Sequence, residues 1–261
     1  MQPLFNTNGL MFWTNEEIKL REHFIEHFAN RVESILWREN QAWRLVRVEA
    51  PMLTPTSLLN PNYTQEDVFW QMNQGMSDGD YTLSLRPETT PGSYIYAQHL
   101  LTTHSGHKPP LCVWQAGKSF RREQDQVIKN MRLKEFWQQE FQCIYAADTS
   151  NDYLTAILEP MRSVISMKLG YPLELSRIVE SDRLPSYSQI TMDIEINNGD
   201  KWMEVCSISR RTDYPDELVF SGKNGIRIEK DALVLEIAIG LDRCLYCYEA
   251  RRNADNHHEG H

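Results

Sequence analysis

The chain has 261 residues, of which 41% are hydrophobic, a composition that is ordinary for one soluble globular domain. The formal net charge is −9 and no dense block of Lys or Arg is present, which argues against a protein that binds nucleic acid through a basic patch. No apolar run approaches the roughly 20 residues that span a bilayer, and the N-terminus lacks a basic-then-apolar signal, so we expect a cytoplasmic protein without membrane contact.

The first predicted element is a long amphipathic helix from Thr14 to about Glu39. Its start, Thr14-Asn-Glu-Glu17, has the Ser/Thr-x-x-Glu form of a capping box. Apolar residues recur along it at helical spacing and give it one apolar face: Ile18, Ile25, Phe28, Val32, Ile35 and Leu36. A strand over residues 43–50 follows and stops at Pro51, which cannot donate to a sheet ladder and therefore belongs at a strand end or a sheet edge.

This helix and strand are also the predicted contact between two copies of the chain. Phe24, Ile25 and Phe28 lie near an end of the helix that we expect to be exposed. An apolar patch on the surface of a monomer is typical of an interaction site. We therefore expect a homodimer that forms through residues 14–39 and the strand ending at Pro51.

After a loop-rich region over residues 57–80, two strand-like arms enclose a polar turn. The first arm ends in Phe120-Arg-Arg-Glu123, and the second begins with Arg132-Leu-Lys-Glu-Phe136 and continues to Glu140. Because strand residues of one parity share a face, an antiparallel hairpin projects a set of side chains together. These are Arg121, Glu123, Arg132 and Phe136. Two guanidinium groups, a carboxylate and a ring are suited to hold phosphates, an exocyclic amine and a stacked base.

Two further elements complete the chain. Residues 148–175 predict a helix that is stopped by Gly170 and Pro172, and residues 233–249 predict an apolar strand, a glycine turn and a helix. Cys244 and Cys247 form a Cys-x-x-Cys pair on that last helix, but no second pair accompanies it, so we expect core thiols rather than a zinc site. The polar residues 251–261 are expected to be a disordered tail, which leaves residues 1–250 as one domain.

The double pattern Phe-Arg-x-Glu, loop, Arg-x-x-x-Phe resembles the second signature motif of the class II aminoacyl-tRNA synthetases. The alternative is an ordinary surface hairpin with charged faces. Such a hairpin would not need all of these residues at these spacings, so the whole pattern favours the resemblance. The resemblance implies that Arg121 grips the α-phosphate of ATP and the amino acid carboxylate, and that Glu123 reads the adenine amino group. It also implies that Arg132 reaches the γ-phosphate and that Phe136 stacks on adenine.

The other two signature motifs of that family have counterparts in the right order. The long helix, strand and Pro51 resemble the first motif, which builds the dimer interface, although Ala42 and Trp43 stand where a Gly usually begins the strand. The strand followed by Gly240-Leu-Asp-Arg243 resembles the third motif. The resemblance implies that Gly240 allows close approach of the nucleotide and that Arg243 sandwiches adenine against Phe136. It also implies the α+β fold of this class, a mostly antiparallel sheet flanked by helices with α/β-type layering.

Segments between the motifs are similar to glycyl-tRNA synthetases. Arg86-Pro-Glu-Thr-Thr90-Pro-Gly92 resembles that family's Arg-Pro-Glu-Thr-Ala-Gln-Gly, and residues 202–214 resemble its stretch ending in Arg-Thr-Asp-Tyr. A glycine site must pair an ammonium group, which carries one positive charge, with acids. By resemblance these acids are Glu88, Glu204 and Glu236; Glu204 has a second possible role as a ligand of Mg²⁺.

The chain departs from the glycyl pattern at two places in this pocket. Ala238 stands where the family has a Ser near the substrate, and Thr90-Pro91 replaces the usual Ala-Gln. A pocket that lost one polar contact can admit another small amino acid, since rejecting one methylene is worth only about 1 to 3 kcal/mol. Glu204-Val-Cys-Ser also has a seryl-enzyme character. Glycine is the expected substrate, and alanine and serine remain alternatives.

The resemblance implies a ligase that forms an aminoacyl-adenylate from ATP and a small amino acid and transfers it to tRNA. Arg121 and Arg243, with Mg²⁺, are the expected catalytic groups that offset charge on the transferring phosphate. Because few residues follow the third motif, we expect no anticodon-binding domain and contact with the tRNA acceptor stem through residues 124–131. The alternatives are a paralogue that loads a carrier protein or another acceptor, and a non-catalytic regulatory paralogue.

Overall fold

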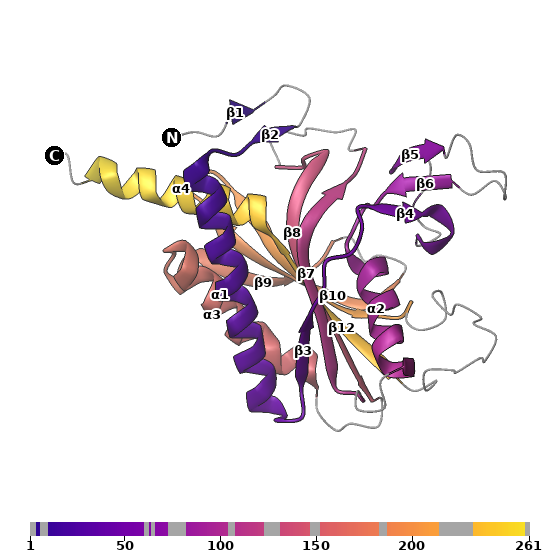
Figure 1. Cartoon of the computed structure of the whole chain (residues 1–261). Coiled ribbons are helices and arrows are strands. Elements are labelled where there is room, and N and C mark those ends of the chain that lie inside the picture. Colours follow the sequence, from indigo (N-terminus) through magenta and orange to yellow (C-terminus); the bar gives the residue numbers. More distant parts are fainter. Residues whose placement is uncertain are drawn as a thin grey trace.

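The computed structural model describes residues 4–5, 10–59, 63, 66–72, 82–103, 108–122, 131–146, 152–182, 187–213 and 232–258. Within these residues a seven-stranded sheet is flanked by four α-helices (Figure 1). The helices are α1 (Asn15–Glu39), α2 (Thr90–Thr103), α3 (Tyr153–Leu169) and α4 (Leu241–His258). The predicted α+β fold with a mostly antiparallel sheet is therefore confirmed.

The strand order of the large sheet is β3-β7-β8-β12-β11-β10-β9. Its strands are β3 (Arg44–Arg47), β7 (Leu111–Phe120), β8 (Glu135–Ala146), β12 (Ala232–Gly240), β11 (Trp202–Arg211), β10 (Ser188–Asn197) and β9 (Ser176–Glu180). All neighbours in it are antiparallel except β3, which lies at the edge and runs parallel to β7. The short strand before Pro51 is thus an edge strand, as its sequence predicts.

Smaller elements lie around this sheet. A three-stranded sheet consists of β4 (Leu53–Pro55), β6 (Thr82–Leu85) and β5 (Phe69–Met72), and β1 (Leu4–Phe5) pairs with β2 (Met11–Phe12). Two 3₁₀ turns cover Thr56–Leu58 and Leu173–Leu175. Much of the expected loop-rich region over residues 57–80 lies outside the described residues, and the described part of it includes β5.

The start of α1 follows from local chemistry. The carboxylate of Glu17 accepts a hydrogen bond of 2.6 Å from the backbone N–H of Thr14, which would otherwise lack a partner at the helix start. The helix ends at Glu39, as predicted. Helix α3 begins at Tyr153 and ends at Gly170, which has the left-handed φ of 77° that favours glycine at a helix C-terminus.

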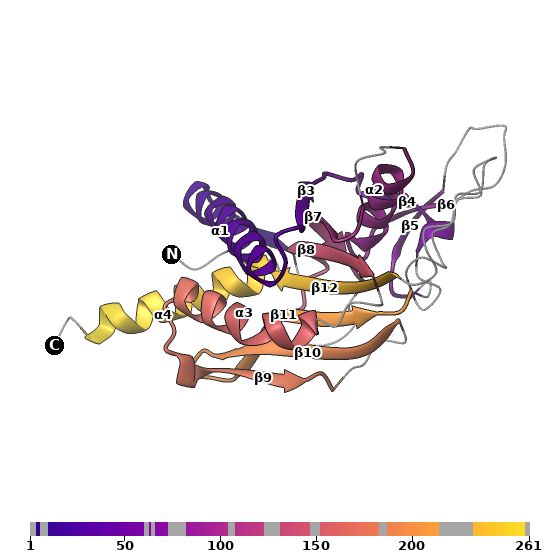
Figure 2. The same cartoon turned by 90° about the horizontal axis from the view of Figure 1, so that it is seen from below.

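The two faces of the sheet are covered differently. Helices α1, α3 and α4 pack on one face, and α2 lies on the other (Figure 2). Strand β12 shows the alternation: Leu235, Ile237 and Ile239 point into the core under the three helices, whereas Val234 packs with α2. The residues that follow Val234 on its face, beyond α2, are Glu236, Ala238 and Gly240. That uncovered part of the face is where the functional site lies.

Two expectations about the surface and the tail are wrong. Phe24, Ile25 and Phe28 are buried inside the chain, because the apolar face of α1 packs on the sheet and on α3 and α4; they form no exposed patch. Residues 251–258, part of the expected disordered tail, continue α4, whose end projects beyond the sheet (Figure 1). Cys244 and Cys247 are both buried and free, as expected of core thiols. No described helix is long and apolar enough to cross a bilayer.

Candidate active site

A cavity of about 550 Å³ lies on the uncovered part of the sheet. Its walls come from alternate residues of β8, β10, β11 and β12, together with the segment before α2, the end of β7 and the start of α4. Most of the predicted site residues line it: Glu88, Arg121, Arg132, Phe136, Glu204, Glu236, Gly240 and Arg243. Glu123, which is expected to read adenine, lies outside the described residues.

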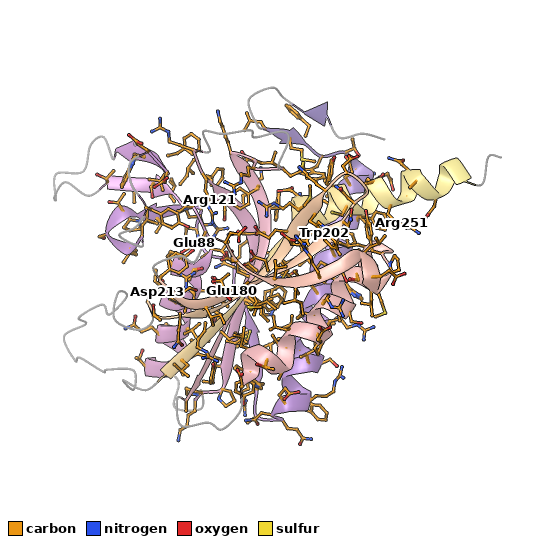
Figure 3. All side chains as sticks on the ribbon, turned by 180° about the vertical axis from the view of Figure 1, so that it is seen from behind. Glu88, Arg121, Glu180, Trp202, Asp213 and Arg251 are labelled. Atoms are coloured by element: carbon orange, nitrogen blue, oxygen red, sulfur yellow. The ribbon has the colours of Figure 1, made fainter. Side chains whose placement is uncertain are left out.

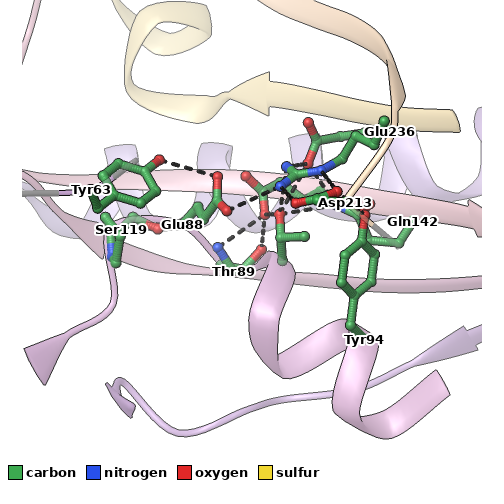
Figure 4. A network of polar contacts seen from close by, with 12 residues as sticks. Tyr63, Glu88, Thr89, Tyr94, Ser119, Gln142, Asp213 and Glu236 are labelled. Carbon is green, nitrogen blue, oxygen red and sulfur yellow. Dashed lines mark hydrogen bonds and ion pairs between the residues drawn. The ribbon is translucent and has the colours of Figure 1, made fainter. Parts of the chain in front are cut away.

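One end of the cavity, called here the acid end, is a buried cluster of four carboxylates around one guanidinium (Figure 4). Arg211 Nη2 lies 3.3 Å from Glu88 and 2.5 Å from Asp213, and Arg211 Nη1 lies 2.8 Å from Glu236. The side chain of Arg211 is only 1% exposed. Its own burial lowers the pKa of Arg211, but Glu236 and Glu88 more than offset this and raise it, so the group stays charged.

Glu140 is the fourth carboxylate of the acid end. It accepts hydrogen bonds from the backbone N–H of Thr89, at 3.0 Å, and from the Thr89 hydroxyl. Burial, followed by repulsion from Glu236 and Glu88, raises the pKa of Glu140 to about 8. Four carboxylates against one contacting guanidinium would leave three negative charges if all were ionised. A buried cluster with this excess favours a bound cation or a retained proton.

The other end, called here the arginine end, holds the groups predicted to bind the nucleotide. Arg121 follows β7, donates from Nε to the carbonyl of Pro87 at 3.0 Å, and lies with its guanidinium 5.3 Å from the ring centroid of Phe136. It therefore stands between the two ends, next to Glu88 (Figure 3). Arg243 projects from the first turn of α4 and pairs with Glu204 at 2.9 Å.

A β-bulge brings Glu204 to the cavity. Ile194 pairs with Cys206, but Glu195 pairs with Glu204, so Val205 is an extra residue on β11. At the bulge two consecutive residues, Val205 and Cys206, both point into the core. The alternation of the strand is therefore reversed beyond them, and Glu204 lies on the same cavity face as Ser207. Without the bulge, strict alternation would turn Glu204 away from the cavity.

Glu204 lies apart from the acid end, because its carboxylate pairs with Arg243, whereas Glu88 and Glu236 contact Arg211. Glu236 pairs with Ser209, and Glu204 lies five residues further along β11. At ~3.3 Å per residue, and with the extra residue Val205 left out, the two backbones are about 13 Å apart. The carboxylates contact different partners, Arg243 for Glu204 and Arg211 for Glu236. Of the two roles left open for Glu204, a place near the phosphates is the one that its pairing with Arg243 favours.

Several residues of the acid end escaped the sequence analysis. Arg211 and Asp213 lie within a segment noted for its resemblance, but adjacent Arg210 has the same chemistry and points outward to Asp152. Glu140 carried a usable signal, because it has the same parity as Phe136 on β8 and both line the cavity. Thr90 was noted only as a departure from the pattern, yet its hydroxyl lies within hydrogen-bond distance of the acid end's carboxylates.

Arg86 holds the frame behind the acid end. It is 3% exposed and donates to three backbone carbonyl groups, at 2.9 Å to Lys118 and at 2.8 and 3.4 Å to Ala50 and Pro51. It also donates to Gln115 Oε1 at 3.2 Å. These bonds tie the segment after β3 to β7, and so fix the position of the neighbouring Glu88.

Comparison with known families agrees with this geometry. A family model described as "tRNA synthetase class II core domain (G, H, P, S and T)" matches residues 69–252. A glycine–tRNA ligase from Mycoplasma capricolum is 29% identical over 191 residues, which cover 68% of this chain and 41% of that protein. One from Bifidobacterium longum is 30% identical over 179 residues, which cover 63% of this chain and 36% of that protein. The chain spans about two fifths of the length of these curated relatives.

Solved structures agree on the fold. Prolyl-tRNA synthetase from Cryptosporidium parvum, complexed with halofuginone and AMPPNP, has a TM-score of 0.69 and 15% identity and covers 95% of this chain and 48% of its own. The Giardia lamblia prolyl-tRNA synthetase in complex with prolyl-adenylate has a TM-score of 0.67 and 17% identity, with 94% and 48% covered. At these identities the likeness concerns the fold alone.

Proposed function

This chain belongs to the family of class II tRNA synthetase core domains, and from that premise we propose that it activates a small amino acid with ATP, with glycine as the favoured substrate. The product is an aminoacyl-adenylate, and tRNA is the proposed acceptor. The glycine–tRNA ligase names of the relatives support the choice of amino acid. Because these reactants occur in the cytoplasm, the cytoplasm is the proposed compartment.

The observation that carries the proposal is the opposite charge at the two ends of one cavity. An amino acid has an ammonium group at one end and a carboxylate at the other, two bonds apart along its backbone. Glu88, Glu236 and Glu140 at the acid end suit the ammonium, and Arg121 beside Glu88 suits the carboxylate. The phosphates of ATP then extend towards Arg132 and Arg243, with adenine on Phe136.

The chemistry needs positioning and charge stabilisation rather than a protein nucleophile. A carboxylate oxygen of the amino acid forms a bond to the α-phosphorus, the bond from that phosphorus to the bridging oxygen breaks, and pyrophosphate leaves with the electron pair. Arg121 holds the attacking carboxylate and the α-phosphate in contact, which supplies both orientation and charge stabilisation. Arg243 offsets the charge that develops on the phosphates.

Magnesium fits the arginine end through one protein ligand. Mg²⁺ commonly takes one or two carboxylates and completes its shell with water and substrate phosphates. The side chain of Glu204 is 43% exposed, faces the cavity and lies beside Arg243, so its carboxylate meets this requirement. When bound, the ion neutralises phosphate charge.

Amino-acid-dependent exchange of pyrophosphate into ATP tests the proposal. We expect exchange with glycine, and Arg121→Ala should reduce it by about 10²- to 10³-fold, the typical cost of removing one preorganised donor. Arg252→Ala is the control, because Arg252 lies near the end of α4, does not line the cavity, and has a side chain that is 65% exposed. Folded protein that gives no exchange with any standard amino acid would instead favour the regulatory paralogue.

The acceptor is tested with three RNAs. If recognition is limited to the acceptor stem, a hairpin that mimics this stem should be charged about as well as intact tRNA, with strong salt dependence because phosphate contacts set the affinity. A tRNA with a swapped anticodon should also remain a substrate. Adenylate formation without charging of any RNA would favour a carrier protein as acceptor.

We also propose a homodimer. The apolar face of α1 is buried within the chain, so the proposal is based instead on apolar side chains that are exposed nearby. Trp37 at the end of α1 is 52% exposed, and Met52 and Leu53, just beyond Pro51, are 49% and 43% exposed. Trp37 belongs to the segments that resemble the dimer motif, Met52 and Leu53 directly follow them, and β3 is an edge strand. Sedimentation equilibrium should give twice the chain mass of 30.6 kDa at micromolar concentration. The monomer mass would contradict the dimer.

A further inference from the structure

We infer that Thr90 is a positioning residue of the acid end and that its hydroxyl replaces the one that Ala238 lacks. Thr90 acts through Glu236 and Glu140 rather than by touching the reacting atoms. The inference rests on the proposed function, because it concerns how the amino acid pocket keeps its carboxylates ready for an ammonium group. It assigns a specific role to two positions at which the chain departs from the glycyl pattern.

The hydroxyl of Thr90 has four polar neighbours. It lies 3.0 Å from Glu236 Oε1 and 3.3 Å from Glu140 Oε2. Gln142 Nε2 and Arg211 Nη1 point their donors at it from 3.2 and 3.3 Å. Thr90 is the first residue of α2 and is 1% exposed, so water does not compete for these contacts.

The hydrogen-bonding capacity of a hydroxyl explains this arrangement. A hydroxyl donates one proton and accepts up to two, so Thr90 can accept from Gln142 and Arg211 and donate to one of the two carboxylates. Both donors also bond Glu236 Oε1, at 2.7 Å from Gln142 and 2.8 Å from Arg211. The hydroxyl thus fixes one oxygen of Glu236 from a third direction.

Position 238 faces the same pair of carboxylates. Ala238 lies two residues after Glu236 on the cavity face of β12, and it is directly opposite Glu140 on β8. A serine at position 238 would therefore bring a hydroxyl between Glu236 and Glu140 from the strand, whereas Thr90 brings one from the helix. The glycyl pattern that the chain resembles has Ser at position 238 and Ala at position 90. This chain instead has Ala238 and Thr90, so the hydroxyl is on the other element.

The charges around the pair explain why a hydroxyl is needed there. Glu140 and Glu236 face each other's negative charge and that of Glu88, and the nearby cations are Arg211 and Arg86. A donor that bonds a carboxylate favours its ionised form. Removing the Thr90 hydroxyl, 3.3 Å from Glu140, therefore promotes protonation of Glu140, and a protonated carboxyl attracts an ammonium group less strongly.

The test is a set of variants that separate hydroxyl from shape. Thr90→Val keeps the branched shape and removes the hydroxyl, and Thr90→Ser keeps the hydroxyl. In the exchange assay we expect Thr90→Val to raise the KM for glycine by about tenfold or more, as for a lost hydrogen bond to a charged group. The KM for ATP should be unchanged, and Thr90→Ser should remain close to the wild type.

The double variant Thr90→Val with Ala238→Ser tests the exchange of positions. The added serine should recover most of the lost glycine affinity. An unchanged KM for glycine in Thr90→Val would overturn the positioning role. A double variant no better than Thr90→Val would overturn the claim that the two hydroxyls are equivalent.

A second measurement separates this inference from the proposed function. If the wild type gives no exchange with any amino acid, the proposed function fails, but the effect on the carboxylates can still be measured. Carbon-13 NMR titration of labelled glutamates should show a higher pKa for Glu140 in Thr90→Val than in the wild type. Identical titration curves in the two folded proteins would overturn the inference.

Discussion

The two ends of the cavity use charge in opposite ways. At the acid end, Arg211 is 1% exposed and its guanidinium is shared by Glu88, Asp213 and Glu236, whose side chains are 4%, 5% and 8% exposed. At the arginine end, the pair of Arg243 and Glu204 is 23% and 43% exposed. The first cluster is part of the folded interior, and the second borders open space.

The difference teaches that a charged site can be tied to folding at one end and nearly independent of it at the other. A buried charge must have a partner, so losing a member of the acid end leaves the others unpaired in a medium that solvates them poorly. Charges at the arginine end retain access to water when a partner is lost. Substitutions at the two ends should therefore separate into effects on stability and effects on activity.

The largest effect is expected from Arg211→Ala. Removing the one guanidinium in contact with three buried carboxylates should cost about 3 to 5 kcal/mol of unfolding free energy. Urea denaturation followed by circular dichroism measures this loss. Arg210→Ala is the matched control, because Arg210 pairs with Asp152, whose side chain is 55% exposed, and should cost less than about 1 kcal/mol. Equal losses in the two variants would contradict the comparison.

Two glycines test the same contrast with a single added carbon. A Cβ at Gly117 would overlap Nη2 of Arg86, a buried guanidinium whose Nε and Nη1 donate to backbone carbonyl groups, so Gly117→Ala should cost about 1 to 3 kcal/mol in a urea titration. A Cβ at Gly240 would contact the side chain of Arg243, with the nearest atom, Cδ, at 3.6 Å, which is an ordinary van der Waals distance. Gly240→Ala should thus keep stability within about 0.5 kcal/mol. It should impair exchange if the nucleotide needs that space.

The acid end should also make stability depend on pH. Glu140 has a folded pKa of about 8 and Asp242 one of about 7, both above their ordinary values because of burial. The folded state then binds more protons than the unfolded state, so stability is full below the ordinary carboxyl pKa and is lost as pH rises towards 8. His27 acts oppositely: burial lowers its pKa to about 4, so it favours folding as pH rises, but only below about 6.5.

Between pH 6.5 and 8, therefore, the carboxyl groups change the stability without an opposing contribution from His27. There we expect the free energy of unfolding to fall with increasing pH, by at most about 1.4 kcal/mol per pH unit for each proton that the folded state retains. The urea midpoint should fall with it. Glu140→Gln should flatten the fall, and glycine should reduce it in the wild type by placing a cation beside the carboxylates. A midpoint that rises with pH in this window would contradict the assignment.

The smallest effect on stability is expected from Glu204→Gln. The pair with Arg243 is partly exposed, so its loss should change the unfolding free energy by less than about 1 kcal/mol. Because Glu204 is the proposed ligand of Mg²⁺, the variant should require more Mg²⁺ for half-maximal exchange. An unchanged requirement for Mg²⁺ would remove Glu204 from the arginine end's chemistry.

The sequence by itself determined the parts of this protein that depend on local interactions. Helix α1 begins and ends where the capping box and the apolar periodicity predict, because both act between residues three or four positions apart. The hairpin of β7 and β8 brings Arg121 to Phe136, as its motif predicts, since an antiparallel pair fixes which residues share a face. The family resemblance also identified eight of the residues that line the cavity.

Only the tertiary structure decided which charges meet. Arg210 and Arg211 are adjacent and chemically equal, and the register of β11 alone sends one outward and the other into the acid end. The bulge at Val205 then reverses that parity and places Glu204 on the cavity face, where it pairs with Arg243 rather than with Arg211. Thr90 reaches Glu236 across 146 positions of the sequence. Such contacts depend on how distant segments pack, and a single sequence records each residue's chemistry but not which distant residue it will face.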